Sequence, residues 1–325
     1  MLRYSHRIMS SPITLPEISL QAKIATVQNE YRELVPWKNE AFDPVKLVTA
    51  FAAKGDLQSC QSEVFQLELL IKNLNDIRKP RPDVFSSLRA KIYKCGNYSN
   101  HVGLRMEARI ASSLARKGVG FSYVDAPDFT VKVEGGTAFI ECTGVLPADV
   151  PHGKDMRYKI ASAINKKSAM PYANGSTAVA VEATSVFAAM ITAGLSGDDT
   201  DLNQYLPPLL ASTSLGAVLV FHVVYDREAS FLRFVYHRFD CHGIALELKR
   251  LLDEEYPFVG GQIRNPFVPG ARTLLPIYRA DFPVWYESGT IVQVLPADGR
   301  LLGLHRHLPS LSAGALNVRY APVKT

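Results

Sequence analysis

The feature that most constrains this chain is a pair of short alternating runs joined by a glycine-rich turn. In the runs 128–133 (DFTVKV) and 137–143 (TAFIECT), apolar and polar residues alternate with the period of two that places successive side chains on opposite faces of a strand. The intervening Glu134-Gly135-Gly136 favours a tight turn, because glycine tolerates the positive φ angles that such turns require. We therefore predict a β-hairpin at the centre of the fold.

This hairpin would bring two carboxylates together, because a turn at Gly135-Gly136 places Asp128 and Glu141 at the same end of the two strands. Two like unit charges at ~4 Å repel by about 4 kcal/mol at an effective dielectric of ~20, so such a pair usually shares a proton or binds a cation. Mg²⁺, or Mn²⁺ in its place, suits oxygen ligands. Asp128 alone could be an ordinary turn residue, whereas Glu141 occupies an apolar strand in which an unpaired carboxylate is costly.

Helices and strands are expected on both sides of the hairpin. Apolar residues at helical spacing predict one helix before it, at 104–117, and one after it, at 158–169. The apolar run 177–184 predicts a buried strand. The expected order is helix, strand, strand, helix, strand. Further elements are predicted at 216–224 (strand), 233–239 (strand), 244–252 (helix) and 290–295 (strand).

The N-terminal part of the chain has helical patterns at 24–34 and 64–77, and the sequence KPRP at 79–82 interrupts them, since proline removes a hydrogen-bond donor. A short helix is expected to follow at 83–94. We predict a helical N-terminal region (1–82), an α/β core with a mixed sheet of about five strands flanked by helices (83–225) and a C-terminal α+β extension (226–325).

Three short motifs resemble a known family. Glu107 stands in the helix before the hairpin, Pro127-Asp128-Phe129 opens the hairpin, and Ile140-Glu141-Cys142-Thr143 closes it. Over residues 100–184 this arrangement resembles the PD-(D/E)XK nuclease superfamily, whose core has the same series of helix, strand, strand, helix and strand.

The resemblance implies a restriction-endonuclease-like core and a Mg²⁺-dependent endonuclease or phosphodiesterase. In that reading Asp128 and Glu141 bind the metal, and Glu107 assists as an outer-shell or second-metal group. A surface position beside Arg105 and Arg109 is the ordinary alternative for Glu107. The substrate would be nucleic acid, with DNA favoured over RNA.

The chain departs from the family pattern at Thr143, where a lysine is expected two residues after the second carboxylate. A hydroxyl cannot supply a fixed positive charge. Lys167 is the candidate substitute, because it continues the stripe formed by Ile160 and Ile164 on one face of the second core helix. The alternative is a lysine whose stem covers apolar surface while its ammonium reaches water. Thr143 and Lys166 remain secondary candidates.

Positive charge is concentrated between Arg78 and Lys117, although the net charge of the whole chain is only +5. Such a segment suits a phosphate backbone, and a solvated basic face is an equally ordinary explanation. The residues predicted to contact nucleic acid are Arg89, Lys91, Lys94, Arg105 and Arg109.

Other kinds of site are disfavoured. The four cysteines are scattered and predict no disulfide framework, and neither the His305/His307 pair nor the group at His237, Asp240, Cys241 and His242 has a recognised zinc spacing. No phosphate-binding loop, GxSxG or dinucleotide-binding motif occurs. The absence of long apolar runs and of a signal sequence predicts a cytoplasmic protein without a membrane partner.

Two alternatives to a nuclease stay open. One is a catalytically inactive protein that keeps the nuclease fold and serves as a nucleic-acid-binding or assembly module. The other is an α/β domain for a small molecule or protein, in which the motif arose by chance. Strandedness, sequence specificity and homodimer formation are left open by the sequence.

Overall fold

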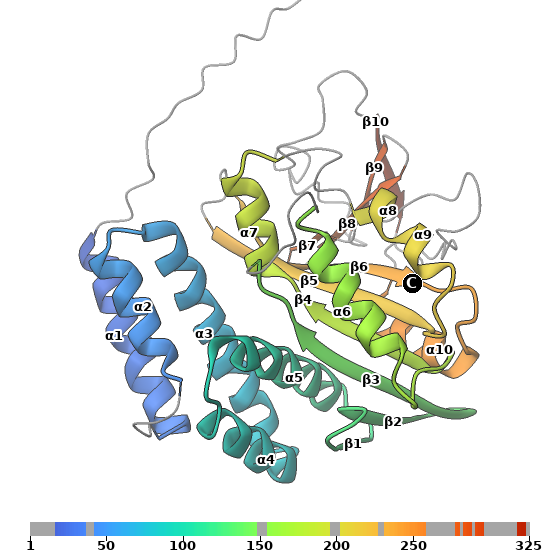
Figure 1. Cartoon of the computed structure of the whole chain (residues 1–325), viewed down its shortest axis with the longest axis horizontal. Helices are drawn as coiled ribbons and strands as arrows, with labels where there is room; N and C mark the ends of the chain where they lie inside the picture. Colours follow the sequence, from blue (N-terminus) through green and yellow to red (C-terminus); the bar gives the residue numbers. More distant parts are fainter. Residues whose placement is uncertain are drawn as a thin grey trace, which may run out of the picture.

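A six-stranded mixed sheet with the strand order β1-β2-β3-β4-β5-β6 forms the centre of the computed structural model (Figure 1). The structure describes residues 17–36, 42–147, 155–195, 202–226, 231–257, 277–279, 282–287, 290–295 and 317–322. The three central strands run parallel to one another, and the outer strands pair antiparallel. The strands are β1 (Phe121–Tyr123), β2 (Phe129–Val133), β3 (Gly136–Gly144), β4 (Thr177–Glu182), β5 (Ala217–Asp226) and β6 (Phe231–Asp240).

The predicted hairpin is confirmed as β2 and β3, in which Phe129 pairs with Ile140 and Val133 with Gly136. The chain turns at Gly135, whose φ of 90° is accessible to glycine without strain. Because β2 begins one residue later than predicted, Asp128 lies immediately before it and one step beyond the Phe129–Ile140 pair. The hairpin therefore places Asp128 opposite Glu141, as the alternating pattern required.

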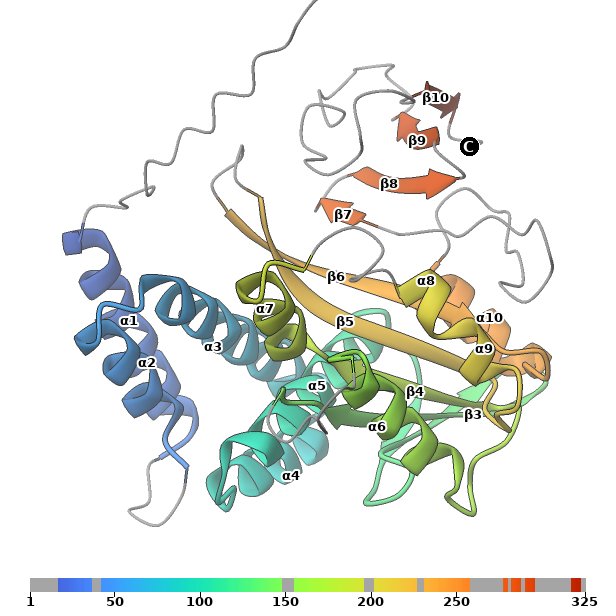
Figure 2. The same ribbon diagram turned by 45° about the horizontal axis from the view of Figure 1, so that its top comes forward.

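Helices cover both faces of this sheet, which explains why all six residues of β4 are buried. On one face, α6 contacts β4 and α7 contacts β5. On the other, α5 contacts β3 and β4, and α10 contacts β2 and β3 (Figure 2). The prediction of an α/β fold with a mixed sheet is confirmed, with six strands instead of about five. The helices of these layers are α5 (Tyr98–Arg116), α6 (Tyr158–Ser168), α7 (Thr184–Thr192), α8 (Leu202–Tyr205), α9 (Pro207–Leu210) and α10 (Leu246–Glu255).

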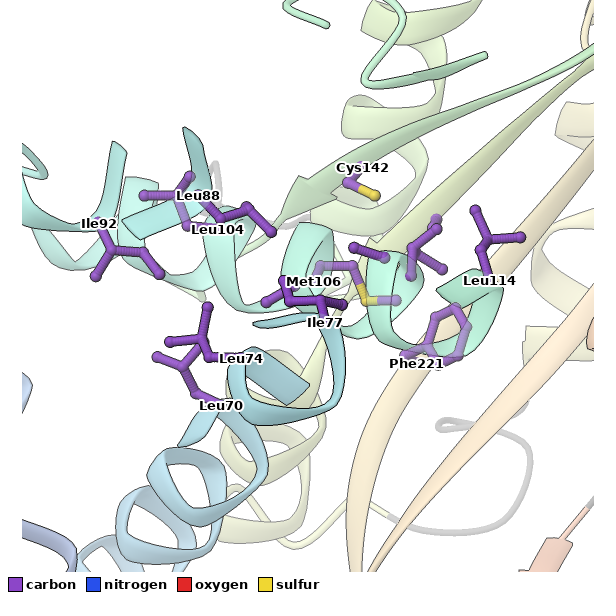
Figure 3. Packing of buried hydrophobic residues seen from close by; sticks show 14 of the residues in the cluster. Leu70, Leu74, Ile77, Leu88, Ile92, Leu104, Met106, Leu114, Cys142 and Phe221 are labelled. Carbon is purple, nitrogen blue, oxygen red and sulfur yellow. The ribbon is translucent and has the colours of Figure 1, made fainter. Parts of the chain in front are cut away.

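The N-terminal helices pack against α5 and share its hydrophobic core. Figure 3 shows Leu74 and Ile77 of α3 in one cluster with Met106 of α5 and Phe221 of β5. The expected boundary after residue 82 falls at the start of α4, and residues on both sides of it contribute to this core. The helices are α1 (Glu17–Leu34), α2 (Pro44–Ala53), α3 (Leu57–Arg78) and α4 (Pro82–Tyr93).

The C-terminal boundary expected after residue 225 falls near the end of β5, between the two strands of the antiparallel pair β5–β6. Strand β6 belongs to the central sheet, and α10 packs on the same face as α5. A separate four-stranded sheet with the order β10-β9-β8-β7 follows, and its β9 is the strand predicted at 290–295. Its strands are β7 (Ile277–Arg279), β8 (Phe282–Glu287), β9 (Thr290–Leu295) and β10 (Asn317–Pro322).

Helix α5 approaches β3 so closely that a side chain at Gly144 would not fit. A Cβ atom there would lie 2.5 Å from Val102 Cγ1 and 3.0 Å from the backbone nitrogen of Gly103. Glycine at this position thus allows the helix that carries Glu107 to pack on the strand that carries Glu141. This close approach brings the candidate acidic residues of two elements into one region.

Candidate functional site

Asp128 and Glu141 lie at the open end of the hairpin, where each carboxylate accepts a hydrogen bond from a backbone N–H of the opposite side. The Asp128 N–H donates to Glu141 Oε2 at 3.2 Å, and the Cys142 N–H donates to Asp128 Oδ2 at 2.7 Å. Asp128 is 6% exposed and Glu141 3% exposed. The sequence prediction that these two carboxylates lie side by side is therefore confirmed.

Lys167 of α6 reaches this pair. Its ammonium donates a short hydrogen bond to Glu141 Oε1, and its side chain remains 23% exposed. Ile160 and Ile164 of the same helix are buried against the sheet, so the predicted stripe holds Lys167 over β3. The expected proximity of Lys167 to the carboxylates is confirmed, whereas its role is not tested by this contact.

The electrostatic state of Asp128 reflects crowding of negative charge. Burial raises the pKa of this carboxyl to about 8, and the neighbouring Glu107 and Glu141 carboxylates add to the effect. The hydrogen bond from Cys142 and the charge of Lys167 act in the opposite direction. Near neutral pH the isolated protein thus holds a proton at Asp128, and a cation in the site would favour the ionised form instead.

Glu107 is the third carboxylate, held by two side chains from other elements. The Tyr123 hydroxyl of β1 donates to Glu107 Oε2 in a short hydrogen bond, and Lys91 Nζ of α4 lies 3.6 Å from the same oxygen. Burial raises the pKa of Glu107, which the Glu141 charge also raises and the contacts with Tyr123 and Lys91 lower. Glu107 therefore lies near the Asp128–Glu141 pair and is not a solvent-facing surface glutamate.

Two carboxylate oxygens remain for an external partner. The hydrogen bonds and ion pairs of Glu107 in the described residues all use Oε2, and those of Asp128 use Oδ2. Their other oxygens, Oε1 and Oδ1, suit a hard cation, and Mg²⁺ commonly binds through one or two carboxylates while it keeps several waters. Within the described part of the chain, no three His, Cys, Asp or Glu side chains converge to form a complete metal-binding group.

The remaining residues predicted near the carboxylates are placed as follows. Thr143 is half-buried on β3, two residues beyond Glu141 and on the same face of the strand. Lys166 is exposed and Lys159 half-buried on α6. Only Lys167 of these lysines has an ion pair with Glu141. The helix phase predicted from the apolar stripe is therefore correct.

The residues predicted to contact nucleic acid divide into two groups. Arg89 and Lys94 are exposed on and just after α4. Arg105 requires a correction, because it is 5% exposed and its guanidinium donates to Glu63 Oε2 at 2.8 Å. Arg109 is half-buried, with its guanidinium carbon 3.3 Å from the centroid of the Phe234 ring. Both arginines point into the protein because they lie on the α5 face that packs on α3 and the sheet.

The histidine groups set aside from the sequence have other partners. His237 Nε2 lies 2.9 Å from His222 Nε2, and the Phe187 ring stacks on His222 at 3.8 Å. Asp240 is paired with Arg238 at 2.7 Å. All four cysteines are free and buried, as expected. The pair His305/His307 lies outside the described residues.

Sequence reasoning missed three tyrosine and lysine contributions to this region. Tyr123 belongs to a three-residue strand too short for a periodic signal, and Lys91 was assigned to nucleic-acid binding from charge clustering alone. Tyr172 follows α6, and burial raises the pKa of its hydroxyl, with a further contribution from the charges of Glu141 and Asp128. The half-burial of these side chains becomes visible only in the structure, so no sequence signal identified them.

Comparison with known proteins adds no assignment: no family model, curated protein or solved structure matches this chain. None of the helices in the described residues is long and apolar enough to cross a membrane.

Proposed function

We propose that this protein is a metal-dependent nuclease that hydrolyses phosphodiester bonds of nucleic acid, with DNA favoured over RNA. The observation that carries this proposal is the arrangement of Asp128, Glu141 and Lys167. Two buried carboxylates meet at the end of a hairpin, and a lysine from the following helix contacts one of them. Mutually repelling buried carboxylates and an adjacent lysine are costly to keep unless they serve a bound ligand.

The proposed roles follow from the contacts of each side chain. Asp128 Oδ1 and the Glu141 carboxylate would hold the cation, Mg²⁺ or Mn²⁺, with Glu107 Oε1 nearby. When bound, such an ion polarises the phosphoryl oxygen and lowers the pKa of water. Lys167 would supply the fixed positive charge that Thr143 cannot, since it already lies at the Glu141 carboxylate.

The order of elements also supports the proposal. Helix α5, hairpin β2–β3, helix α6 and strand β4 follow the series that the PD-(D/E)XK resemblance implies, with β1 as an additional edge strand. Arg89 and Lys94 on and after α4 offer positive charge that suits a phosphate backbone. A restriction-endonuclease-like core and a cytoplasmic location are parts of the proposal.

The direct test is incubation of the purified protein with plasmid, single-stranded DNA and RNA in Mg²⁺, Mn²⁺ or EDTA. We expect cleavage in Mg²⁺ or Mn²⁺ and none in EDTA. Cleavage that persists in EDTA would contradict a metal-dependent mechanism. No cleavage of any substrate, together with no Mn²⁺ binding by electron paramagnetic resonance, would reject the proposal.

A second candidate is an inactive nuclease-fold protein that binds nucleic acid, and one observation favours it. The Lys167 ammonium already neutralises Glu141, which would allow the acidic pair to exist without an ion. Lys167→Met separates the two candidates. In an active enzyme it lowers the cleavage rate by about 10²- to 10³-fold, the usual cost of one charge-stabilising group. Lys159→Met, on the same helix, serves as control, and an inactive protein shows DNA binding without turnover in every variant.

A further inference from the structure

Helix α4 lies outside residues 100–184, the segment that carries the nuclease resemblance, yet one of its lysines reaches the candidate site. Lys91 Nζ lies 3.6 Å from Glu107 Oε2 and 3.4 Å from Asp125 Oδ1. The same ammonium lies 4.5 Å from the centroid of the Tyr123 ring, within the range of a cation–π contact. Helix α4 therefore contributes charge directly to the acidic cluster.

Lys91 and Tyr123 contact the same carboxylate oxygen. Tyr123 donates a hydrogen bond to Glu107 Oε2, and Lys91 lies beside that oxygen, while the described contacts of Glu107 leave Oε1 without a protein partner. Two contacts to one oxygen restrict rotation of the carboxylate about its last bond. They thus direct Oε1 away from α4 and Tyr123.

We propose that Lys91 and Tyr123 are positioning residues, which orient Glu107 so that Oε1 completes the metal-binding site with Asp128 and Glu141. This inference rests on the proposed function and extends it to α4. It also assigns Lys91 a different role from the phosphate contact expected from the sequence. Partners of this kind, which orient a ligand without binding the metal, typically change metal affinity or activity by about 10- to 100-fold.

A purely structural ion pair would behave differently. The Lys91 side chain is 33% exposed, and ion pairs of such lysines contribute little to stability because water competes for the charges. The Lys23–Glu68 pair, at 3.0 Å between α1 and α3, is a matched example away from the site. If Lys91 acted only through stability, its removal would resemble removal of Lys23.

The experiment compares Lys91→Met, Tyr123→Phe, Lys91→Arg and the control Lys23→Met in the full-length protein. Two quantities are measured: the Mg²⁺ concentration for half-maximal cleavage, and Mn²⁺ affinity by electron paramagnetic resonance without nucleic acid. We expect Lys91→Met and Tyr123→Phe to weaken both by about 10- to 100-fold. Lys91→Arg should recover most of the loss, and Lys23→Met should match the wild type. Thermal melting of each variant verifies that it is folded.

A double substitution provides the decisive control. If Lys91 acts through Glu107, then Lys91→Met should cause no further loss in a Glu107→Gln background. Equal losses in both backgrounds, or wild-type Mn²⁺ affinity in Lys91→Met, would overturn the inference while the nuclease proposal stands. A wild-type protein that neither binds Mn²⁺ nor cleaves would reject the nuclease proposal itself, and with it the role of Lys91.

Discussion

Two clusters of buried charge in this protein differ in how their cations are held. In the pair Glu63–Arg105 between α3 and α5, the arginine is 5% exposed and bonded to its carboxylate at 2.8 Å. In the candidate site, two lysines contact the group of three carboxylates. Lys167, 23% exposed, pairs with Glu141, and Lys91, 33% exposed, pairs with Glu107. A buried guanidinium locks two helices together, whereas a partly exposed lysine beside carboxylates with unbonded oxygens leaves room for a ligand.

Tyr98 strengthens the contrast between the two clusters. Its hydroxyl donates a short hydrogen bond to Glu63 and accepts one from Arg105 at 3.3 Å. Both members of the Glu63–Arg105 pair therefore have Tyr98 as an additional hydrogen-bond partner. Among the residues that the structure describes, the Cys142 N–H is the one hydrogen-bond donor to the Asp128 side chain. We infer that the Glu63–Arg105 pair serves folding and the acidic site serves binding, which makes the effects of substitution opposite in the two regions.

The largest expected effect separates activity from stability at the site. Asp128→Asn and Glu141→Gln should each abolish metal-dependent cleavage, because each removes a proposed metal ligand. The melting temperature of Asp128→Asn should stay near the wild-type value, because Asp128 is already protonated near neutral pH and asparagine keeps an oxygen for the Cys142 N–H. Glu141→Gln should lower the melting temperature, because it removes the ion pair with Lys167. Cleavage assays at saturating Mg²⁺ and thermal melting measure both quantities. Wild-type cleavage by either variant would show that the metal site is wrongly placed.

A substitution in the Glu63–Arg105 pair should have the opposite effect, a loss of stability without a loss of activity. Arg105→Met should lower the free energy of unfolding by about 3–5 kcal/mol, because it leaves Glu63 buried without its partner. Denaturant titration measures this loss. The folded fraction should keep wild-type cleavage and wild-type salt dependence of DNA binding. A large drop in DNA affinity at unchanged stability would instead return Arg105 to the nucleic-acid contacts.

The pH dependence of stability sharpens the comparison further. Burial and neighbouring carboxylates raise the pKa of Asp128 to about 8, so the folded state holds a proton that the unfolded state releases near its ordinary pKa. From about pH 4, the ordinary pKa of aspartate, to about pH 8 the folded state therefore binds more protons at Asp128, and stability falls as pH rises until Asp128 is ionised in both states. Denaturant titrations in EDTA should show a smaller decrease in Asp128→Asn than in the wild type. Equal decreases would remove Asp128 as the cause.

The smallest expected effect concerns the exposed basic residues. Replacing Arg89 and Lys94 together by glutamine should make the slope of log affinity against log salt shallower by about 0.9 for each lost phosphate contact. Stability should not change, because both side chains are exposed. Fluorescence anisotropy with the catalytically silent Glu141→Gln protein measures the slope. An unchanged slope would identify this surface as a solvated basic face. Lys54→Gln provides the control, because Lys54 is exposed and lies outside the basic segment between Arg78 and Lys117.

Local patterns in the sequence were sufficient for the hairpin, the surrounding elements and the meeting of Asp128 with Glu141. The reason is that strand alternation and a glycine turn determine which residues stand opposite each other. The helical stripe of Ile160 and Ile164 likewise determined that Lys167 faces the sheet, because the 3.6-residue period leaves only one phase in which those residues are buried.

Tertiary structure alone decided which distant side chains complete these elements. Lys91 and Arg105 both belong to one basic stretch of sequence, yet one contacts Glu107 in the site and the other is buried against Glu63. Charge clustering along the chain cannot distinguish these outcomes, because it is the packing of α4 and α5 on α3 and the sheet that determines whether a cation meets solvent, a partner or a ligand. Sequence separation hides such contacts, and only the folded arrangement of helices brings their residues within the few ångströms over which charges act strongly.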